Sequence, residues 1–177
     1  MEKQSESEFK PEIHHTAIIE GNVTAPITTH IEAYCVLALG NNAELILGER
    51  NTFYPNVTIR SKCGVIRLGN DVSLGPGVII YEARAGLEIG DNCMLAAGTR
   101  ICGTSHGSRL GEPMRFQKTT AAHIKIGQDV WIGMNTIIHP GVEIGEGSII
   151  GSGSIVTKSI PSYCVAMGAP CKVARRR

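Results

Sequence analysis

The chain carries a repeat of six residues, and this repeat limits the folds that it can adopt. In the last third of the sequence a large aliphatic residue recurs at every sixth position, at Ile126, Ile132, Ile138, Ile144, Ile150 and Val156. A second series, mostly small or β-branched, follows four residues after each of these: Val130, Thr136, Val142, Ser148, Ser154 and Ile160. A period of six matches neither an α-helix nor the alternation of one long strand. It predicts short strands joined by corners.

Five longer blocks share this pattern, and each carries an aliphatic–glycine pair at the same place. They begin at Leu45, Ile66, Leu87, Ile124 and Val142, which are 21, 21, 37 and 18 residues apart. Three six-residue segments make one coil of 18 residues, so the expected fold is an all-β solenoid shaped as a triangular prism with the aliphatic side chains inside. The glycine after each aliphatic residue is expected to permit the corner.

The residues in excess of 18 all follow the third hexapeptide of their coil, so they are expected to stack on one edge of the prism. The longest excursion contains the loop 107–123, and a loop of this length in a regular solenoid is usually functional or binds a neighbour. The predicted organisation is a flexible segment 1–12, a β-helix over 13–160 with an irregular first coil, and a C-terminal loop and tail over 161–177.

Composition excludes several classes of function. A net charge of +1 provides no electrostatic footprint for nucleic acid, and no apolar stretch is long enough to span a membrane. The polar N-terminus has no apolar core of a signal peptide, which predicts a cytoplasmic protein. The six cysteines show neither a CxxC pair nor metal-ligand spacing, so they are expected to be reduced thiols, and no metal is expected.

The segments CGTSHG and IGQDVWIG…PGVEIGEGSIIGSGSIVTKSIPSYCVAMGAPCKVARR closely resemble the hexapeptide-repeat acyltransferases. The resemblance covers about Leu45 to Arg175 and is to the galactoside, maltose and nodulation acetyltransferases and to polysaccharide O-acetyltransferases. It implies a left-handed parallel β-helix, a homotrimer with active sites between subunits, and acetyl-CoA as co-substrate. The implied reaction is O-acetylation of a sugar, a glycan or another small polar acceptor.

His106 matches the catalytic histidine of that family and stands where the long excursion begins. A hydroxyl or amine acceptor must lose a proton as it attacks the thioester carbonyl, and a neutral imidazole is suited to accept it. Glu82 and Arg84 lie one coil below on the same edge. Together with Arg115 they are the candidate acceptor-binding residues. Gly75 departs from the pattern, because the galactoside enzyme has a substrate-binding asparagine there, and this argues against an identical substrate.

The resemblance also implies a groove for CoA along the later coils. Trp131 and Gly133 match residues at its thioester end, and Ser152 and Gly153 match residues of its wall. Three further residues match the nucleotide end, where cations near the phosphates are physically sensible: Thr157, Lys158 and Lys172. Small residues in such a groove allow close approach of the pantetheine arm.

The sequence leaves three alternatives open. N-acetylation of an amino sugar or an antibiotic would use the same fold and the same base. A γ-carbonic anhydrase-like trimer would bind zinc through three histidines, but the chain has no HxxxxH-like pair, and His106 and His123 are 17 residues apart. A non-catalytic β-helix scaffold would need neither His106 nor the long loop.

Overall fold

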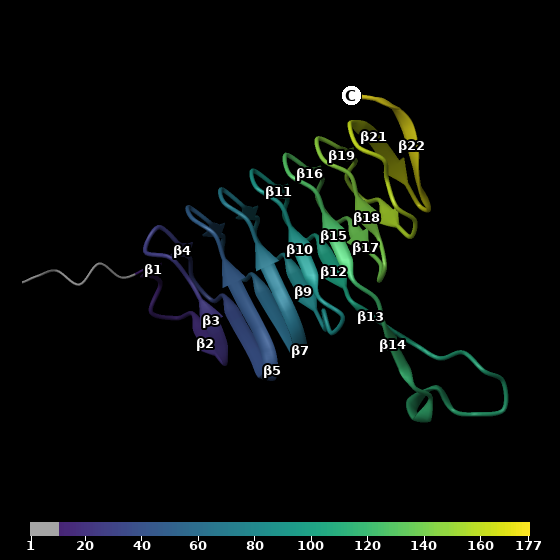
Figure 1. The fold of residues 1–177 in the computed structure, drawn as a ribbon, viewed down its shortest axis with the longest axis horizontal. Coiled ribbons are helices and arrows are strands. Elements are labelled where there is room, and N and C mark those ends of the chain that lie inside the picture. Colours follow the sequence, from purple (N-terminus) through teal and green to yellow (C-terminus); the bar gives the residue numbers. More distant parts are fainter. Residues whose placement is uncertain (1–10) are drawn as a thin grey trace, which may run out of the picture.

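The structure is a computed structural model that describes residues 11–177. The chain winds as a β-helix along one axis, with β1 at one end and β22 at the other (Figure 1). Nearly all strand pairs are parallel, because each strand pairs with the equivalent strand of the coils below and above. The fold is the left-handed parallel β-helix that the resemblance implied. Three columns of strands form the faces of the prism.

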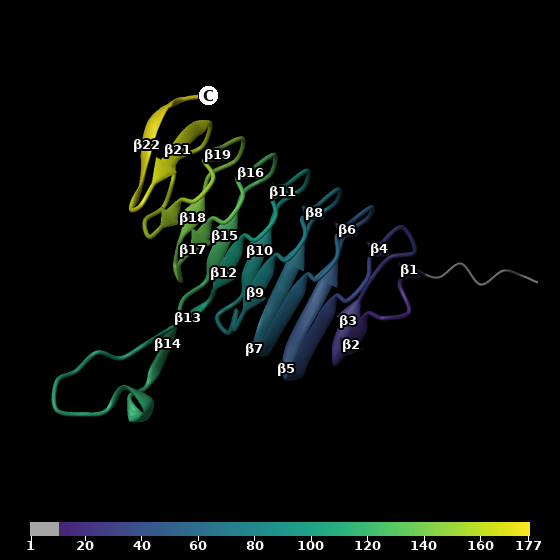
Figure 2. The same ribbon diagram turned by 180° about the vertical axis from the view of Figure 1, so that it is seen from behind.

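The first face is a sheet in which each coil contributes one short strand. Figure 2 shows most of these strands following one another along the axis. They are β1 (Glu12–Ile13), β4 (His30–Ile31), β6 (Thr52–Phe53), β8 (Ser73–Leu74), β11 (Met94–Leu95), β16 (Trp131–Ile132), β19 (Ile149–Ile150) and β21 (Cys164–Gly168). The last strand, β22 (Cys171–Arg176), pairs antiparallel with β21.

The second and third faces are joined, because two long strands run from one to the other. These strands are β5 (Val36–Leu47) and β7 (Thr58–Leu68). The second face contains their first halves together with β2 (Ile18–Glu20), β9 (Ile79–Tyr81), β12 (Arg100–Cys102), β17 (Ile137–Ile138) and β20 (Ile155–Val156). The third face contains their second halves together with β3 (Asn22–Thr24), β10 (Leu87–Ile89), β15 (Ile124–Ile126) and β18 (Glu143–Ile144).

The core is the column of inward side chains that the period of six predicts. All six members of the aliphatic series from Ile126 to Val156 are buried, and so is the second series from Val130 to Ile160. The second series includes Thr136, Ser148 and Ser154, whose hydroxyls donate to backbone carbonyls of the corners. The polar atoms of these small residues are therefore satisfied inside an otherwise apolar prism.

Glycine is needed after the aliphatic residues for a different reason from the corner geometry that the sequence suggested. Gly127, Gly133 and Gly145 do not have positive φ. A Cβ on Gly133 would lie 2.5 Å from the backbone nitrogen of Ser152 in the next coil, so glycine is needed for close stacking of coils. The left-handed backbone falls two residues further on, at positions such as Asp129 (φ 53°) and Asn135 (φ 55°).

The ends of the chain complete the stack. A flexible segment was predicted for residues 1–12, and residues 1–10 of it lie outside the described residues. Glu12 belongs to strand β1. In the first coil Ile13, Ile18 and Ile19 are exposed, as an irregular coil would have it. Residues 161–177 form β21 and β22, which continue the first face. No helix of the described part of the chain is long and apolar enough to cross a membrane.

Candidate functional site

The chain leaves the prism once at length, between β12 and β15. This excursion contains β13 (Thr104–His106), a 3-10 turn η1 (Met114–Phe116) and β14 (Thr119–Ala121). β13 and β14 pair antiparallel and form a two-stranded ribbon that projects away from the prism (Figure 1). We call the edge between the second and third faces, from which it projects, the excursion edge.

His106 is the last residue of β13 and lies directly opposite Thr119 in β14. It is exposed, and within residues 11–177 its ring makes no hydrogen bond. Side chains that lie directly opposite one another in an antiparallel pair share one face of the ribbon. The imidazole is thus free to meet a ligand on the face where the Thr119 side chain also lies.

Glu82 and Arg84 lie on the excursion edge one coil below the ribbon, as predicted. Glu82 is 3% exposed, has a left-handed backbone (φ 52°), and its Oε2 accepts a hydrogen bond from Nε of Arg84. This bond to Glu82 raises the pKa of the Arg84 guanidinium, so it stays charged. Nη1 of Arg84 donates to Oγ1 of Thr119 at 3.3 Å. The structure therefore brings the acidic and basic candidates together beside the ribbon.

Arg115 lies in η1, at the far part of the excursion. The backbone of this part of the excursion is held by Gln117. The Gln117 side chain is buried and bonds to the backbone of Arg109 and Glu112. A small pocket of about 380 Å³ lies inside this loop, and Arg115 does not line it. Among residues 11–177 Arg115 forms no hydrogen bond or ion pair with Glu82, Arg84 or His106.

The candidate donor residues lie at several separate places on the prism. Trp131 points outward from the first face and is 48% exposed. The corner between the first and second faces holds Gly133, Ser152 and Gly153, and a Cβ on Gly153 would meet open space. Thr157 and Lys158 follow β20 on the excursion edge, at the last coil, and Lys172 lies in β22. Both lysines are exposed.

His106 and Trp131 thus lie on different sides of one prism. His106 follows β12 on the excursion edge, which separates the second face from the third, whereas β16 belongs to the first face. The first face meets each of the other two faces at a corner but does not touch the excursion edge. A single chain cannot present both residues to one small ligand.

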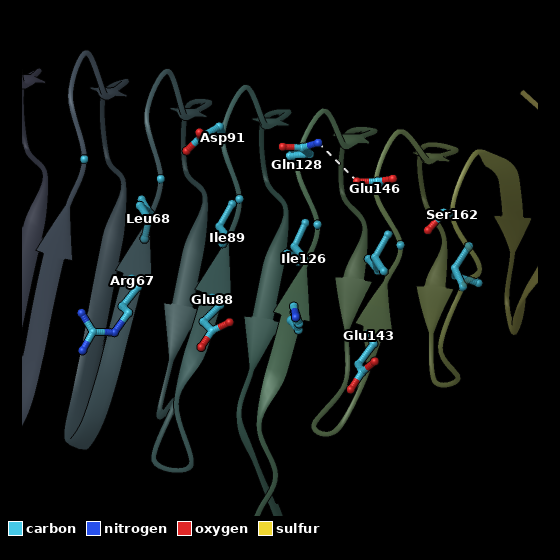
Figure 3. A pocket seen from close by; sticks show the side chains of 18 of the residues that line it. Arg67, Leu68, Glu88, Ile89, Asp91, Ile126, Gln128, Glu143, Glu146 and Ser162 are labelled. Carbon is cyan, nitrogen blue, oxygen red and sulfur yellow. Dashed lines mark hydrogen bonds between the residues drawn. The ribbon is translucent and has the colours of Figure 1, made fainter.

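One large groove was not predicted. It has a volume of about 1120 Å³ and runs along the remaining edge, between the third and first faces (Figure 3). Its wall carries alternating charges from successive coils, at Arg67, Glu88, Lys125 and Glu143. A signal was present in the sequence, because each of these residues directly precedes an aliphatic–glycine pair. None of the predicted site residues lines this groove.

In the described part of the chain, the cysteines are thiols without a disulfide or a metal site. All six cysteines are free, four of them buried, and burial raises the pKa of Cys93 to about 11. Among residues 11–177 no group of three or more His, Cys, Asp or Glu side chains is arranged to hold a metal ion.

Two protein-family models match the chain. The model described as bacterial transferase hexapeptide (six repeats) matches residues 123–158, and the model described as hexapeptide repeat of succinyl-transferase matches residues 65–101. Both segments contain the coils whose register is described above. The chain belongs to the hexapeptide-repeat acetyltransferase family.

Relatives in this family carry related names. A protein of Mycobacterium tuberculosis named as a probable acetyltransferase is 34% identical over 134 residues, which are 74% of this chain and 42% of that protein. Galactoside O-acetyltransferase of Escherichia coli is 45% identical over 94 residues, which are 50% of this chain and 43% of that enzyme. The chain thus spans less than half the length of these curated relatives.

Solved structures with the same fold include two that hold CoA compounds. AntD, an N-acyltransferase from Bacillus cereus in complex with dTDP and 3-hydroxybutyryl-CoA, has a TM-score of 0.72 and 18% identity, and the match covers 90% of this chain and 84% of AntD. Galactoside acetyltransferase in complex with coenzyme A has a TM-score of 0.51 and 31% identity, over 78% of this chain and 64% of that one.

Proposed function

We propose that the protein is an acyltransferase that moves an acetyl group from acetyl-CoA to a hydroxyl of a small polar acceptor, such as a sugar or glycan. The observation that carries this proposal is the position of His106. It stands at the start of a long excursion of a hexapeptide-repeat β-helix, is exposed, and has no hydrogen-bond partner for either ring nitrogen among the described residues 11–177. Family membership and the similarity to galactoside O-acetyltransferase support the acetyl donor and a hydroxyl acceptor.

In the proposed reaction His106 acts as general base. A ring nitrogen accepts the acceptor's hydroxyl proton while the oxygen attacks the thioester carbonyl. The tetrahedral intermediate then collapses, the C–S bond breaks, and the imidazolium returns the proton to the departing CoA sulfur. The acetyl ester and free CoA thiol are the products, and His106 is again neutral. A positioned base of this kind contributes roughly 10²–10⁴ in rate.

The donor end is proposed to use Trp131, Gly133, Ser152, Gly153 and the cations that follow them. The corner between the first and second faces suits an extended pantetheine arm, because Gly153 leaves open space where a side chain would stand. Thr157, Lys158 and Lys172 are assigned to the nucleotide end, where the two exposed lysines can pair with phosphates. Glu82, Arg84 and Arg115 are assigned to the acceptor end.

This assignment requires more than one chain, and we propose a homotrimer with an active site at each subunit interface. His106 and Trp131 lie on different sides of the prism, so only a neighbouring copy can bring its first face to the excursion edge. The excursion also carries apolar side chains that a monomer leaves in water, including Leu110 (96% exposed) and Phe116 (73% exposed). Exposed apolar patches of this kind are typical of protein–protein contacts.

Subunit complementation tests the proposal. His106→Ala and Trp131→Ala variants are purified as inactive homo-oligomers, mixed, dissociated and reassembled. Release of the CoA thiol is then measured with acetyl-CoA and a panel of sugar, glycan and amino-sugar acceptors. In a cyclic oligomer roughly a quarter of the interfaces would unite an intact His106 with an intact Trp131, so about that share of wild-type activity should return. No recovery would contradict an active site shared between subunits, and a wild-type protein that never consumes acetyl-CoA would refute the acyltransferase.

A further inference from the structure

The two-stranded ribbon that carries His106 is short and buries few of its own side chains. β13 and β14 contain three residues each, and five of these six residues are exposed. In the part of the chain that the structure describes, the two strands pair only with each other. An isolated two-stranded ribbon is marginally stable in water. The position of His106 therefore depends on the contacts that tie the ribbon to the prism.

Arg84 makes one of these contacts, at the strand facing His106. Its Nη1 donates to Oγ1 of Thr119 at 3.3 Å, and within residues 11–177 no other side chain of the prism bonds to β14. The remaining ties lie nearer the base of the ribbon. The backbone N–H of Ala122 donates to Gly103 O at 3.4 Å, and the His123 ring lies 3.3 Å from Ala85 O.

The geometry places Arg84 beside the imidazole rather than on the far side of the ribbon. Thr119 is the partner of His106 in the antiparallel register, so their side chains share one face. A guanidinium that reaches the Thr119 hydroxyl therefore approaches the face that His106 occupies. It holds the residue opposite the base and leaves the imidazole itself unbonded.

The guanidinium is fixed at its other end. Nε of Arg84 is bound to the carboxylate of Glu82, which is buried in the excursion edge. Gly103, at the start of the excursion, packs directly on the same segment, since a Cβ there would lie 2.5 Å from Glu82 O. The planar, forked guanidinium can bond to Glu82 and Thr119 together, which a lysine ammonium does with less geometric control.

We infer that Arg84 is a positioning residue, which holds the His106 ribbon through Thr119 while Glu82 fixes its guanidinium. The inference rests on the proposed role of His106 as base. It explains why an ion pair lies under an otherwise exposed ribbon. It also predicts that part of the effect of Arg84 on catalysis is exerted through Thr119, a residue that sequence patterns did not single out.

The test removes the hydroxyl of Thr119 and leaves its shape. In Thr119→Val, amide hydrogen exchange of residues 104–106 and 119–121 should become faster, because the tie is lost. The kcat should fall by roughly 10- to 100-fold through misplacement of the base, while KM for acetyl-CoA stays within about 2-fold. Thr119→Ser, which keeps the hydroxyl, should restore both exchange and kcat.

Ser105→Ala is the control, because Ser105 lies in the same ribbon and, in the part of the chain that the structure describes, its hydroxyl makes no hydrogen bond. It should change neither exchange nor kcat appreciably. A second variant, Arg84→Lys, should show the same defects as Thr119→Val, and the double variant should be no worse than the more impaired single variant. Additive losses would mean that Arg84 acts independently of Thr119.

Amide exchange separates this inference from the proposed function, because it needs no turnover. Wild-type exchange rates in Thr119→Val would overturn the positioning role even if His106 proves to be the base. Faster exchange in a protein that transfers no acetyl group would establish the tie and remove the proposed reaction.

Discussion

The side chain of Gln117 bonds to both backbone groups of Arg109: Oε1 accepts from the N–H at 2.8 Å, and Nε2 donates to the carbonyl at 2.9 Å. Nε2 also donates to Glu112 O at 2.7 Å. One buried amide thus closes the far part of the excursion, where the exposed residues of η1 offer little packing. The three bonds tie the two sides of the loop to one side chain.

Gln117→Leu should therefore loosen the excursion without unfolding the prism. The substitution keeps the approximate volume but leaves three backbone groups without their partner, which costs about 1–3 kcal/mol for a buried group. Proteolysis within residues 107–118 should become faster, while the melting temperature of the β-helix changes little. Gln128→Leu is the control, since Gln128 is exposed and, within residues 11–177, its side chain makes one hydrogen bond, to Glu146. Equal protease resistance of both variants would contradict the role of Gln117.

Stacking of the coils should fail locally in Gly127→Ala. A Cβ on Gly127 would lie 2.6 Å from the backbone nitrogen of Glu146, and this neighbour is backbone that cannot rotate away. Overpacking of this kind typically lowers the free energy of unfolding by about 1–3 kcal/mol. Chemical denaturation of this variant and of Gln128→Ala, one residue further on, measures the difference. A stable Gly127→Ala protein would show that the coils can move apart at little cost.

Stability should decrease in alkaline solution because of Cys93. Burial raises the pKa of its thiol from 9.0 to about 11, so the folded state holds the proton at pH values at which the unfolded chain releases it. The resulting stability is present below pH 9 and is lost between about pH 9 and 11. Denaturation curves at pH 8 and pH 10.5 should show this loss, and Cys93→Ala should show a smaller pH dependence from a lower starting stability. An unchanged slope in that variant would assign the loss to other groups.

The alternating charges of the large groove predict a salt-dependent effect. Lys125 lies between Glu88 and Glu143 in the parallel ladder of the third face, so Lys125→Glu would stack three carboxylates at successive coils. Like charges opposite one another destabilise a sheet, and salt screens this repulsion. The variant should be less stable than wild type at low salt and should recover part of the difference at high salt. Lys118→Glu, in the excursion, should show no such recovery.

The sequence predicted the prism well because its signal lies in the inward residues. A strict period of six from Ile126 to Val156 fixes which side chains are buried, and the block from Leu87 places the long excursion after β12. The prediction that these glycines permit the corners was wrong. They allow close approach between coils, which depends on contacts such as that of Gly133 with Ser152, and no single coil contains such a contact. The groove was missed because its charged wall consists of outward residues.

The site was only partly predictable. The excursion edge, shared by His106, Glu82 and Arg84, follows from counting residues per coil. The bond from Arg84 to Thr119 joins residues 35 positions apart through a ribbon whose register the repeat does not encode. The roles assigned to the donor and acceptor residues, the trimer and the cytoplasmic location stay predictions.

His106→Ala shows whether His106 is the base of acetyl transfer. The kcat for acetyl-CoA consumption, measured with the best acceptor of the panel, should fall by at least about 10²-fold. The Kd for CoA, measured by calorimetry on the same sample, should be nearly unchanged, because the contacts to CoA are assigned to other residues and His106 is assigned to the acceptor's proton. A variant that keeps near-wild-type kcat would contradict the account.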